Sequence, residues 1–162
     1  MTKLVLIFSV ASWLYSAPSP CSTATVIIVR HAEKQTGQDP ELSEKGRQRA
    51  ELLAEMLKDA KVKRIYASEY RRTLQTVEPL AKQLSLQVIR YAAAESQSFA
   101  RKLRLQASGT VLIAAHSNTI AEILQGLGIE DRIEVSEDDY SGIYLVTLCA
   151  DHSVLTILRY GD

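Results

Sequence analysis

The fold of this chain is decided by one stretch, VIIVRHAEK at residues 26–34. Its first four residues are β-branched and apolar, which is typical of a strand buried on both faces of a parallel sheet. The apolar run stops abruptly at Arg30 and His31. Open α/β sheets bind ligands beyond the carboxyl ends of their strands, so we predict a binding site that contains these two residues.

A second stretch, VLIAAHSNT at residues 111–119, repeats the design of an apolar strand that ends in a histidine. Two of the three histidines in the chain, His31 and His116, therefore follow predicted strands. Either one alone would read as an ordinary loop or capping histidine. Two such positions, one with an arginine beside it, favour a shared site at one edge of the sheet.

A third stretch, RIYASEYRRTLQT at residues 64–76, predicts a short strand, Ser68 as a helix N-cap, and a helix that begins near Arg71 and Arg72. Helix N-termini attract anions through their free N–H groups and dipole, so arginines at this end do not stabilise the helix. They are well suited to bind phosphate.

In order and spacing, these three stretches resemble the histidine phosphatase superfamily, which has the phosphoglycerate mutase-like fold. The signature of that family is Arg-His-Gly-Glu near the N-terminus, Ser-x-x-x-Arg-x-x-x-Thr in the middle, and a histidine after a late strand. The matching positions here are residues 30–33, then Ser68, Arg72 and Thr76, then His116. The resemblance covers residues 24–160.

This sequence departs from the signature at two places. Ala32 replaces the usual glycine, and it is small enough to keep the backbone close to a phosphate. Ser117 and Asn118 follow the late histidine, where the mutase branch has glycine and the acid phosphatase and phytase branch has aspartate. That aspartate is the usual acid of its branch, so the acid must be sought elsewhere.

The resemblance implies a role for each matching residue. His31 is the predicted nucleophile, whose neutral imidazole attacks phosphorus and forms a phosphohistidine. Its other ring nitrogen is expected to be held by a backbone carbonyl. Arg30, Arg72 and His116 are the predicted phosphate clamp, because cations must surround the negative oxygens. Arg71 competes for the same role, but Arg72 keeps the family spacing from Ser68 and Thr76.

The proton donor to the leaving group is less clear. In mutase-like members a glutamate supplies this proton, and Glu95, after the third predicted strand, is the best positional match. Alternatively, Glu95 is an ordinary surface carboxylate. Glu33 is the second candidate for the acid, and its alternative role is to form an ion pair with a cation. Some short members that act on phosphohistidine need no strong acid.

Composition limits the remaining classes. A chain of 162 residues allows one domain, which we place at residues 24–162. The formal net charge is zero, so no nucleic-acid partner is predicted. No Cys/His spacing of the zinc type is present, so we expect neither a metal nor a cofactor.

The N-terminus differs from the rest of the chain. Lys3 precedes an uncharged apolar run at residues 4–17, so residues 1–22 resemble a secretory signal peptide with an uncertain cleavage site. The run is too short for an ordinary membrane span, and none is predicted after its removal. We therefore expect a periplasmic or secreted protein. A lipid anchor on Cys21, and an uncleaved segment packed on the domain, are the alternatives. A disulfide between Cys21 and Cys149 is permitted in that compartment.

Alternation of strands and helices predicts an α/β fold, a three-layer αβα sandwich with a mainly parallel sheet. Strands are expected near residues 25–30, 63–67, 86–90 and 110–115, and helices near 43–59, 69–83, 97–107 and 118–127. Pro79 should kink or interrupt the second helix. The runs at 143–148 and 154–158 are joined so closely that they predict an antiparallel hairpin at the sheet edge.

These predictions together favour an exported, metal-independent phosphomonoester hydrolase that acts on a small phosphorylated substrate. A mutase is disfavoured, because the chain lacks room for the insertions that enclose a bisphosphate cofactor. A protein phosphohistidine phosphatase and a catalytically silent phospholigand-binding domain are the alternatives. The oligomeric state stays open.

Overall fold

The computed structural model describes residues 24–161, which form one six-stranded sheet with the strand order β3-β2-β4-β1-β5-β6. The strands β1 to β4 pair in parallel, and β5 and β6 pair antiparallel at one end. The predicted mainly parallel sheet with an antiparallel edge hairpin is therefore confirmed. The strands are β1 (Ala24–Arg30), β2 (Val62–Ser68), β3 (Val88–Tyr91), β4 (Thr110–Ala115), β5 (Gly142–Leu148) and β6 (Ser153–Arg159).

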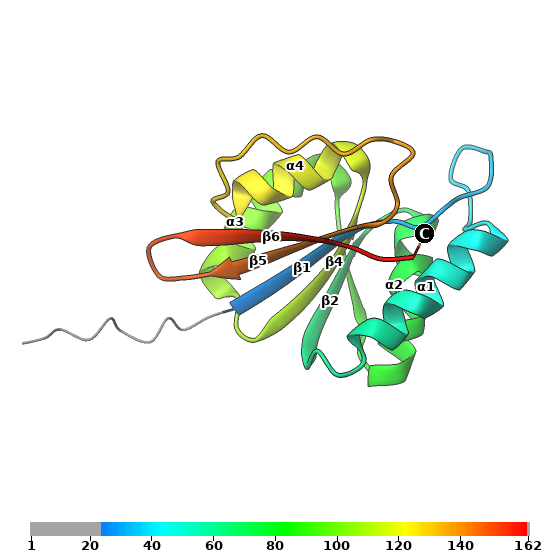
Figure 1. Ribbon diagram of the computed structural model, residues 1–162, viewed down its shortest axis with the longest axis horizontal. Helices are drawn as coiled ribbons and strands as arrows, with labels where there is room; N and C mark the ends of the chain where they lie inside the picture. The colour runs from blue at the N-terminus through cyan, green and yellow to red at the C-terminus, as the bar shows by residue number, and fades with distance from the viewer. Residues whose placement is uncertain (1–23, 162) are drawn as a thin grey trace, which may run out of the picture.

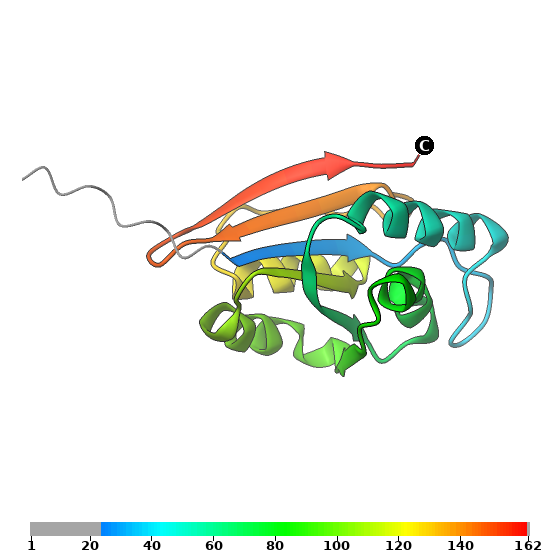
Figure 2. The ribbon, with the colours of Figure 1, turned by 90° about the horizontal axis from the view of Figure 1, so that it is seen from below.

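Helices cover both faces of the sheet, which confirms the three-layer sandwich. Figures 1 and 2 show α1 and α2 together on one face, and α3 and α4 on the other. The helices are α1 (Glu44–Leu57), α2 (Arg71–Leu84), α3 (Ser96–Gln106) and α4 (Ser117–Gly126), and a short 3-10 turn, η1 (Ala93–Glu95), precedes α3.

The strand β1 lies between two hydrophobic cores. Val26 and Ile28 belong to the core under α3 and α4, and Ile27 and Val29 to the core under α1 and α2. Successive side chains of a strand point to opposite faces, so a continuous apolar run can fill both cores. This double burial fixes the position of the residues that follow β1.

Two local expectations need correction. Pro79 does not interrupt α2, which is continuous from Arg71 to Leu84. Val77 and Leu80, on either side of the proline, are fully buried, and their packing compensates for one missing hydrogen bond. The N-cap of α2 is Tyr70, and Ser68 is the last residue of β2. The hydroxyl of Ser68 is used within the site instead.

The predicted signal segment and Cys21 lie outside the described residues, so the structure does not bear on them. Within residues 24–161, no helix has the length and apolar character needed to cross a membrane. Within the same range, no three or more His, Cys, Asp or Glu residues gather closely enough to hold a metal ion.

Candidate active site

Two adjacent strands deliver the two histidines to the same level of the sheet. Arg30 and Ala115 are register partners at the carboxyl ends of β1 and β4. His31 and His116 are the next residues of these strands, and their ring centroids lie 5.3 Å apart. The backbone N–H of His116 donates to Thr119 Oγ1 at 3.0 Å, which fixes the turn into α4.

A cavity of about 440 Å³ opens at this edge of the sheet. The sequence-predicted nucleophile and clamp lie together around it, although they come from three separate stretches of the chain. The residues that line the cavity are Arg30, His31, Lys34, Tyr70, Arg72, Ala93, Ala94, His116, Ser117, Asn118, Thr119, Glu122 and Glu137.

His31 is oriented by its own neighbour. Its Nδ1–H donates to the Ala32 carbonyl at 2.8 Å, as the sequence predicted for the nitrogen that does not attack. The Nε2 atom is then unprotonated and available to a substrate. Burial lowers the pKa of His31 to about 3, and the nearby His116 and arginines act in the same direction. The imidazole is therefore neutral at ordinary pH, as a nucleophile must be.

His116 is held by a chain of hydrogen bonds. Its Nδ1 accepts from Arg72 Nη2 at 3.3 Å, so its Nε2–H donates to Ser68 Oγ at 2.8 Å. Ser68 Oγ lies 2.9 Å from Thr73 Oγ1, which donates to the Tyr70 carbonyl at 2.7 Å. Burial and the Arg72 charge lower the pKa of His116 to about 4. This chain fixes both the ring plane and the tautomer.

Arg30 is held by the loop that precedes β5. Its Nη1 donates to the carbonyls of Ser136 at 3.1 Å, of Glu137, and of Asp139 at 3.3 Å. The guanidinium carbon lies 4.1 Å from the centre of the Tyr140 ring. Arg30 Nε is buried and has no hydrogen-bond partner within residues 24–161. One edge of the guanidinium is thus fixed by protein, and donors remain for an anion.

Arg72, and not Arg71, faces the cavity. The Arg72 guanidinium lies over the Tyr70 ring at 4.5 Å and 3.6 Å from an Asp39 carboxylate oxygen. Its buried Nε has no partner among the described residues. Arg71 is exposed and pairs with Glu41 outside the cavity. The family spacing therefore selected the arginine that lines the site.

The loop after β1, which carries His31 and Ala32, is tied to α2 through Thr76. The backbone N–H of Ala32 donates to Thr76 Oγ1 at 2.9 Å, and Thr76 Oγ1 donates to the Arg72 carbonyl at 2.7 Å. Both Ala32 and Thr76 are buried. The threonine thus couples the position of His31 to the helix that carries Arg72.

Glu33 serves as an ion-pair partner. Its carboxylate accepts from Arg49 Nε at 2.9 Å and from Nη2 at 3.0 Å, and Lys45 Nζ lies 3.3 Å away. Despite partial burial, the hydrogen bonds and charge of Arg49 and Lys45 keep the pKa of Glu33 below its ordinary value. It does not line the cavity. An ionised carboxylate in this position is not a proton donor, so the structure supports the ion-pair interpretation.

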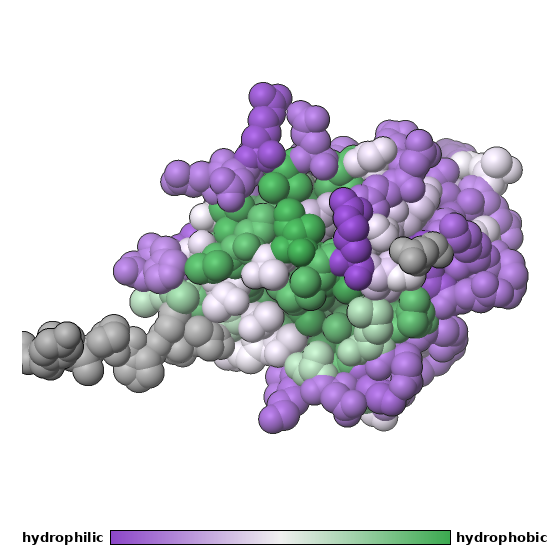
Figure 3. Space-filling model, in the orientation of Figure 1, coloured by the Kyte–Doolittle hydropathy of each residue, from purple (hydrophilic) through white to green (hydrophobic). Residues whose placement is uncertain are grey.

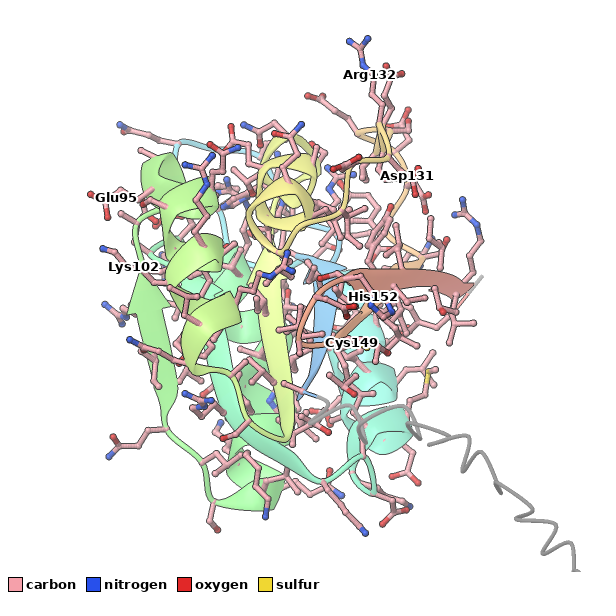
Figure 4. All side chains as sticks on the ribbon, turned by 90° about the vertical axis from the view of Figure 1, so that its left-hand side faces the viewer. Glu95, Lys102, Asp131, Arg132, Cys149 and His152 are labelled. Atoms are coloured by element: carbon pink, nitrogen blue, oxygen red, sulfur yellow. The ribbon has the colours of Figure 1, made fainter. Side chains whose placement is uncertain are left out.

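Glu95 lies outside the cavity as well. It is exposed at the end of η1, and Figure 4 shows it at the periphery of the molecule. It lines a neighbouring hollow together with Ala94 and Glu122. The expected general acid therefore does not line the cavity, because η1 and the start of α3 carry it to the outer surface. The carboxylates that do line the cavity are Glu122 and Glu137.

Sequence reasoning missed the aromatic residues of the site. The Tyr70 and His116 ring centroids lie 5.2 Å apart, and those of Tyr140 and His31 lie 5.9 Å apart. Three backbone carbonyls of the loop before β5 also belong to the site, because they hold Arg30. Backbone carbonyls carry no sequence signal, so no motif could have identified them.

Part of the chain matches a known protein family. Residues 26–95 match the family model described as Histidine phosphatase superfamily (branch 1). Among curated proteins, none matches the sequence.

Several solved structures share the fold at low sequence identity. The protein histidine phosphatase SixA, complexed with tungstate, is 19% identical with a TM-score of 0.66, over 83% of this chain and 96% of that chain. A putative α-ribazole-5'-P phosphatase from Escherichia coli is 14% identical with a TM-score of 0.70, over 85% of this chain and 96% of that chain. A mycobacterial glucosyl-3-phosphoglycerate phosphatase is 16% identical with a TM-score of 0.64, over 86% of this chain and 100% of that chain. These likenesses establish the fold.

Proposed function

We propose that this chain is a member of the histidine phosphatase superfamily and hydrolyses phosphomonoesters through a phosphohistidine on His31. One observation carries the proposal: His31 and His116, with ring centroids 5.3 Å apart, share one cavity with Arg30 and Arg72. The matching family model and the phosphatase structures of the same fold support it.

The geometry suits nucleophilic catalysis at phosphorus. Arg30 and Arg72 surround the phosphoryl oxygens and spread the negative charge that otherwise repels a nucleophile, and the neutral His116 lies beside them. The lone pair of His31 Nε2 attacks phosphorus in line, the bond to the leaving oxygen breaks with its electron pair, and a phosphohistidine forms. Water then attacks this intermediate, releases inorganic phosphate and restores neutral His31. None of these steps needs a metal ion.

The proton for the leaving oxygen must come from within the cavity or from solvent. Glu122 and Glu137 replace Glu95 and Glu33 as the candidate donors, because they alone among the cavity residues carry carboxyl groups.

A second candidate activity is the removal of phosphate from protein phosphohistidine. It is favoured by the position of Glu95 outside the cavity, since such enzymes of the family need no strong acid. The SixA structures of the same fold also support it.

The test is to trap the intermediate with a phosphorus-labelled substrate and acid or alkaline quenching. We expect label that is stable to alkali and labile to acid on His31, and turnover that survives chelators. His31→Ala should abolish both label and turnover. His152→Ala is the matched control, because His152 is exposed in the β5–β6 connection, and it should keep full activity. Label on another residue, or turnover by His31→Ala, would overturn the proposal.

The substrate class is tested in the same assay. Alkyl phosphates, aryl phosphates and a phosphohistidine-bearing protein are compared by kcat/KM. A higher kcat/KM for the phosphohistidine protein than for every phosphomonoester would select the second candidate. Phosphate binding without any turnover would select the silent binding domain.

A further inference from the structure

The edge strand β6 exposes an unusual amount of apolar surface. Val154, Ile157 and Leu158 are 48%, 45% and 48% exposed, which is nearly half of each residue. In the described sheet, β6 pairs with β5 alone, so its other edge is open. Figure 3 shows hydrophobic side chains gathered on the face of the molecule where Figure 1 places β5 and β6.

Proteins usually protect such an edge. They use prolines, lysines, bulges or very short strands, because an open edge is a template for another strand. The strand β6 has none of these devices: it holds register with β5 over seven residues, and its one charge, Arg159, is at its end. The opposite edge strand, β3, has only four residues and carries Arg90 in its middle. The short, charged edge strand β3 is therefore protected against pairing, whereas β6 is suited to pair with another strand.

Two hydrogen bonds define which backbone groups of β6 are free to pair. Cys149 N donates to His152 O at 2.9 Å, and Tyr160 N donates to Ser141 O at 2.9 Å. The backbone N–H and C=O groups of successive residues in an antiparallel strand point to alternate sides, so those of the even-numbered residues of β6 point toward β5. The residues whose N–H and C=O groups point outward are therefore Ser153, Leu155, Ile157 and Arg159.

We propose that β6 pairs antiparallel with β6 of a second copy of this chain, about a two-fold axis at Thr156. In this register Leu155 faces the partner's Ile157, and both turn their backbone groups outward, so they form a hydrogen-bonded pair. Val154 faces the partner's Leu158, and Thr156 faces the partner's Thr156. These are non-hydrogen-bonded pairs, in which side chains approach most closely. Each exposed apolar side chain thus meets another.

Charge also favours this register. Arg159 lies diagonally opposite the partner's Asp151, whose side chain is 87% exposed. Arg159 pairs through Nη1 with Asp139 of its own chain, and its side chain remains 65% exposed toward the partner. A shift by two residues would place Leu155 against Arg159 and Thr156 against Leu158, which exchanges apolar pairs for mixed ones. The contact is isologous, so it closes after two copies and joins both sheets into one.

The oligomeric state of the full chain tests the proposal. We expect sedimentation and light scattering to give twice the chain mass of 18.0 kDa. Thr156→Lys places like charges face to face on the axis and should yield a monomer with an unchanged circular dichroism spectrum. Thr156→Glu should behave likewise, and an equimolar mixture of the two variants should recover the dimer. Ile89→Lys, on the opposite edge strand β3, is the matched control and should remain dimeric.

Cross-linking tests the register. Thr156→Cys places two thiols opposite each other across the axis, so mild oxidation should give a reducible dimer on a gel. Val154→Cys faces the partner's Leu158 and should cross-link far more slowly, and the parent chain sets the background from Cys21 and Cys149. Equal cross-linking of both variants would overturn the register.

Other occupants of the edge give distinct results. A monomeric full chain whose Leu155 and Ile157 amides are protected from hydrogen exchange would show that a segment of the same chain covers β6. A monomeric chain with rapid exchange of these amides would show an open edge. A dimer lost in Ile89→Lys but kept in Thr156→Lys would assign the contact to β3. Each of these results would overturn the proposal.

Discussion

The Glu33–Arg49 ion pair allows a structural carboxylate to be distinguished from a catalytic one. The pair is bidentate, with N–O distances of 2.9 and 3.0 Å, and the side chains of Arg49 and Glu33 are only 7% and 15% exposed. Arg49 also donates to the carbonyls of Tyr160 and Gly161, so it joins the loop after β1 and α1 to the end of the described chain. Glu33→Gln removes the charge and keeps the shape.

The size of the effect follows from the contacts. The amide introduced by Glu33→Gln keeps one oxygen acceptor and loses the other, and a hydrogen bond to a charged group is worth about 1.5–3 kcal/mol. We therefore expect a loss of about 2 kcal/mol in the free energy of unfolding, or roughly 4–8 °C in Tm for a chain of this size. Exposed ion pairs contribute much less, so Glu44→Gln on the same helix, where Glu44 pairs with exposed Arg47, should cost below about 0.5 kcal/mol.

The pH dependence has a defined sign. The pKa of Glu33 in the folded protein is below its ordinary value of 4.5, because Arg49 and Lys45 favour the carboxylate. Its contribution to stability is therefore present above pH 4.5 and is lost as pH falls through the folded pKa. The Tm difference between the parent chain and Glu33→Gln should therefore shrink as the pH falls below 4.5.

Calorimetry and steady-state kinetics on alkyl and aryl phosphates check this reasoning together. We expect Glu33→Gln to change kcat by the same small factor for both substrates, because the residue supplies no proton. A variant with unchanged Tm whose kcat drops about 10² to 10⁴-fold on alkyl phosphates alone would identify Glu33 as the general acid and refute the structural role.

Three further predictions concern the site and the N-terminus. Arg72→Ala should weaken the binding of vanadate or phosphate by about 10- to 100-fold in calorimetry, because it removes a charged donor worth about 1.5–3 kcal/mol. Arg71→Ala is the control and should leave the binding nearly unchanged. NMR should find no titration of His31 or His116 near pH 6.5, because burial lowers their pKa values to about 3 and about 4. Urea unfolding should show a free energy of unfolding that falls as the pH decreases below about 6.5, because the unfolded chain binds more protons there than the folded chain does. Export predicts a mature chain that starts within residues 17–25, and an intact Met1 by mass spectrometry of cell-derived protein would contradict it.

The sequence by itself determined the framework. The apolar run before Arg30 required a doubly buried strand, and the run before His116 required another, because only such positions take up consecutive β-branched and aliphatic side chains. The spacing from Ser68 to Arg72 selected the arginine that faces the cavity. The short connection before β6 required an antiparallel hairpin. These features depend on neighbours within a few residues along the chain.

Only the tertiary structure decided the roles that depend on distant partners. Arg30 is held by carbonyls 106 to 109 residues away, and Ser68 meets His116 across 48 residues. Glu33 looked like a possible acid until Arg49 was found beside it, and Glu95 occupied the right place in the sequence but the outer surface in space. Local patterns fix where a strand ends, because side-chain alternation and backbone geometry act at short range. Which groups then meet at that end depends on how the strands and loops pack, and no short stretch of sequence contains that information.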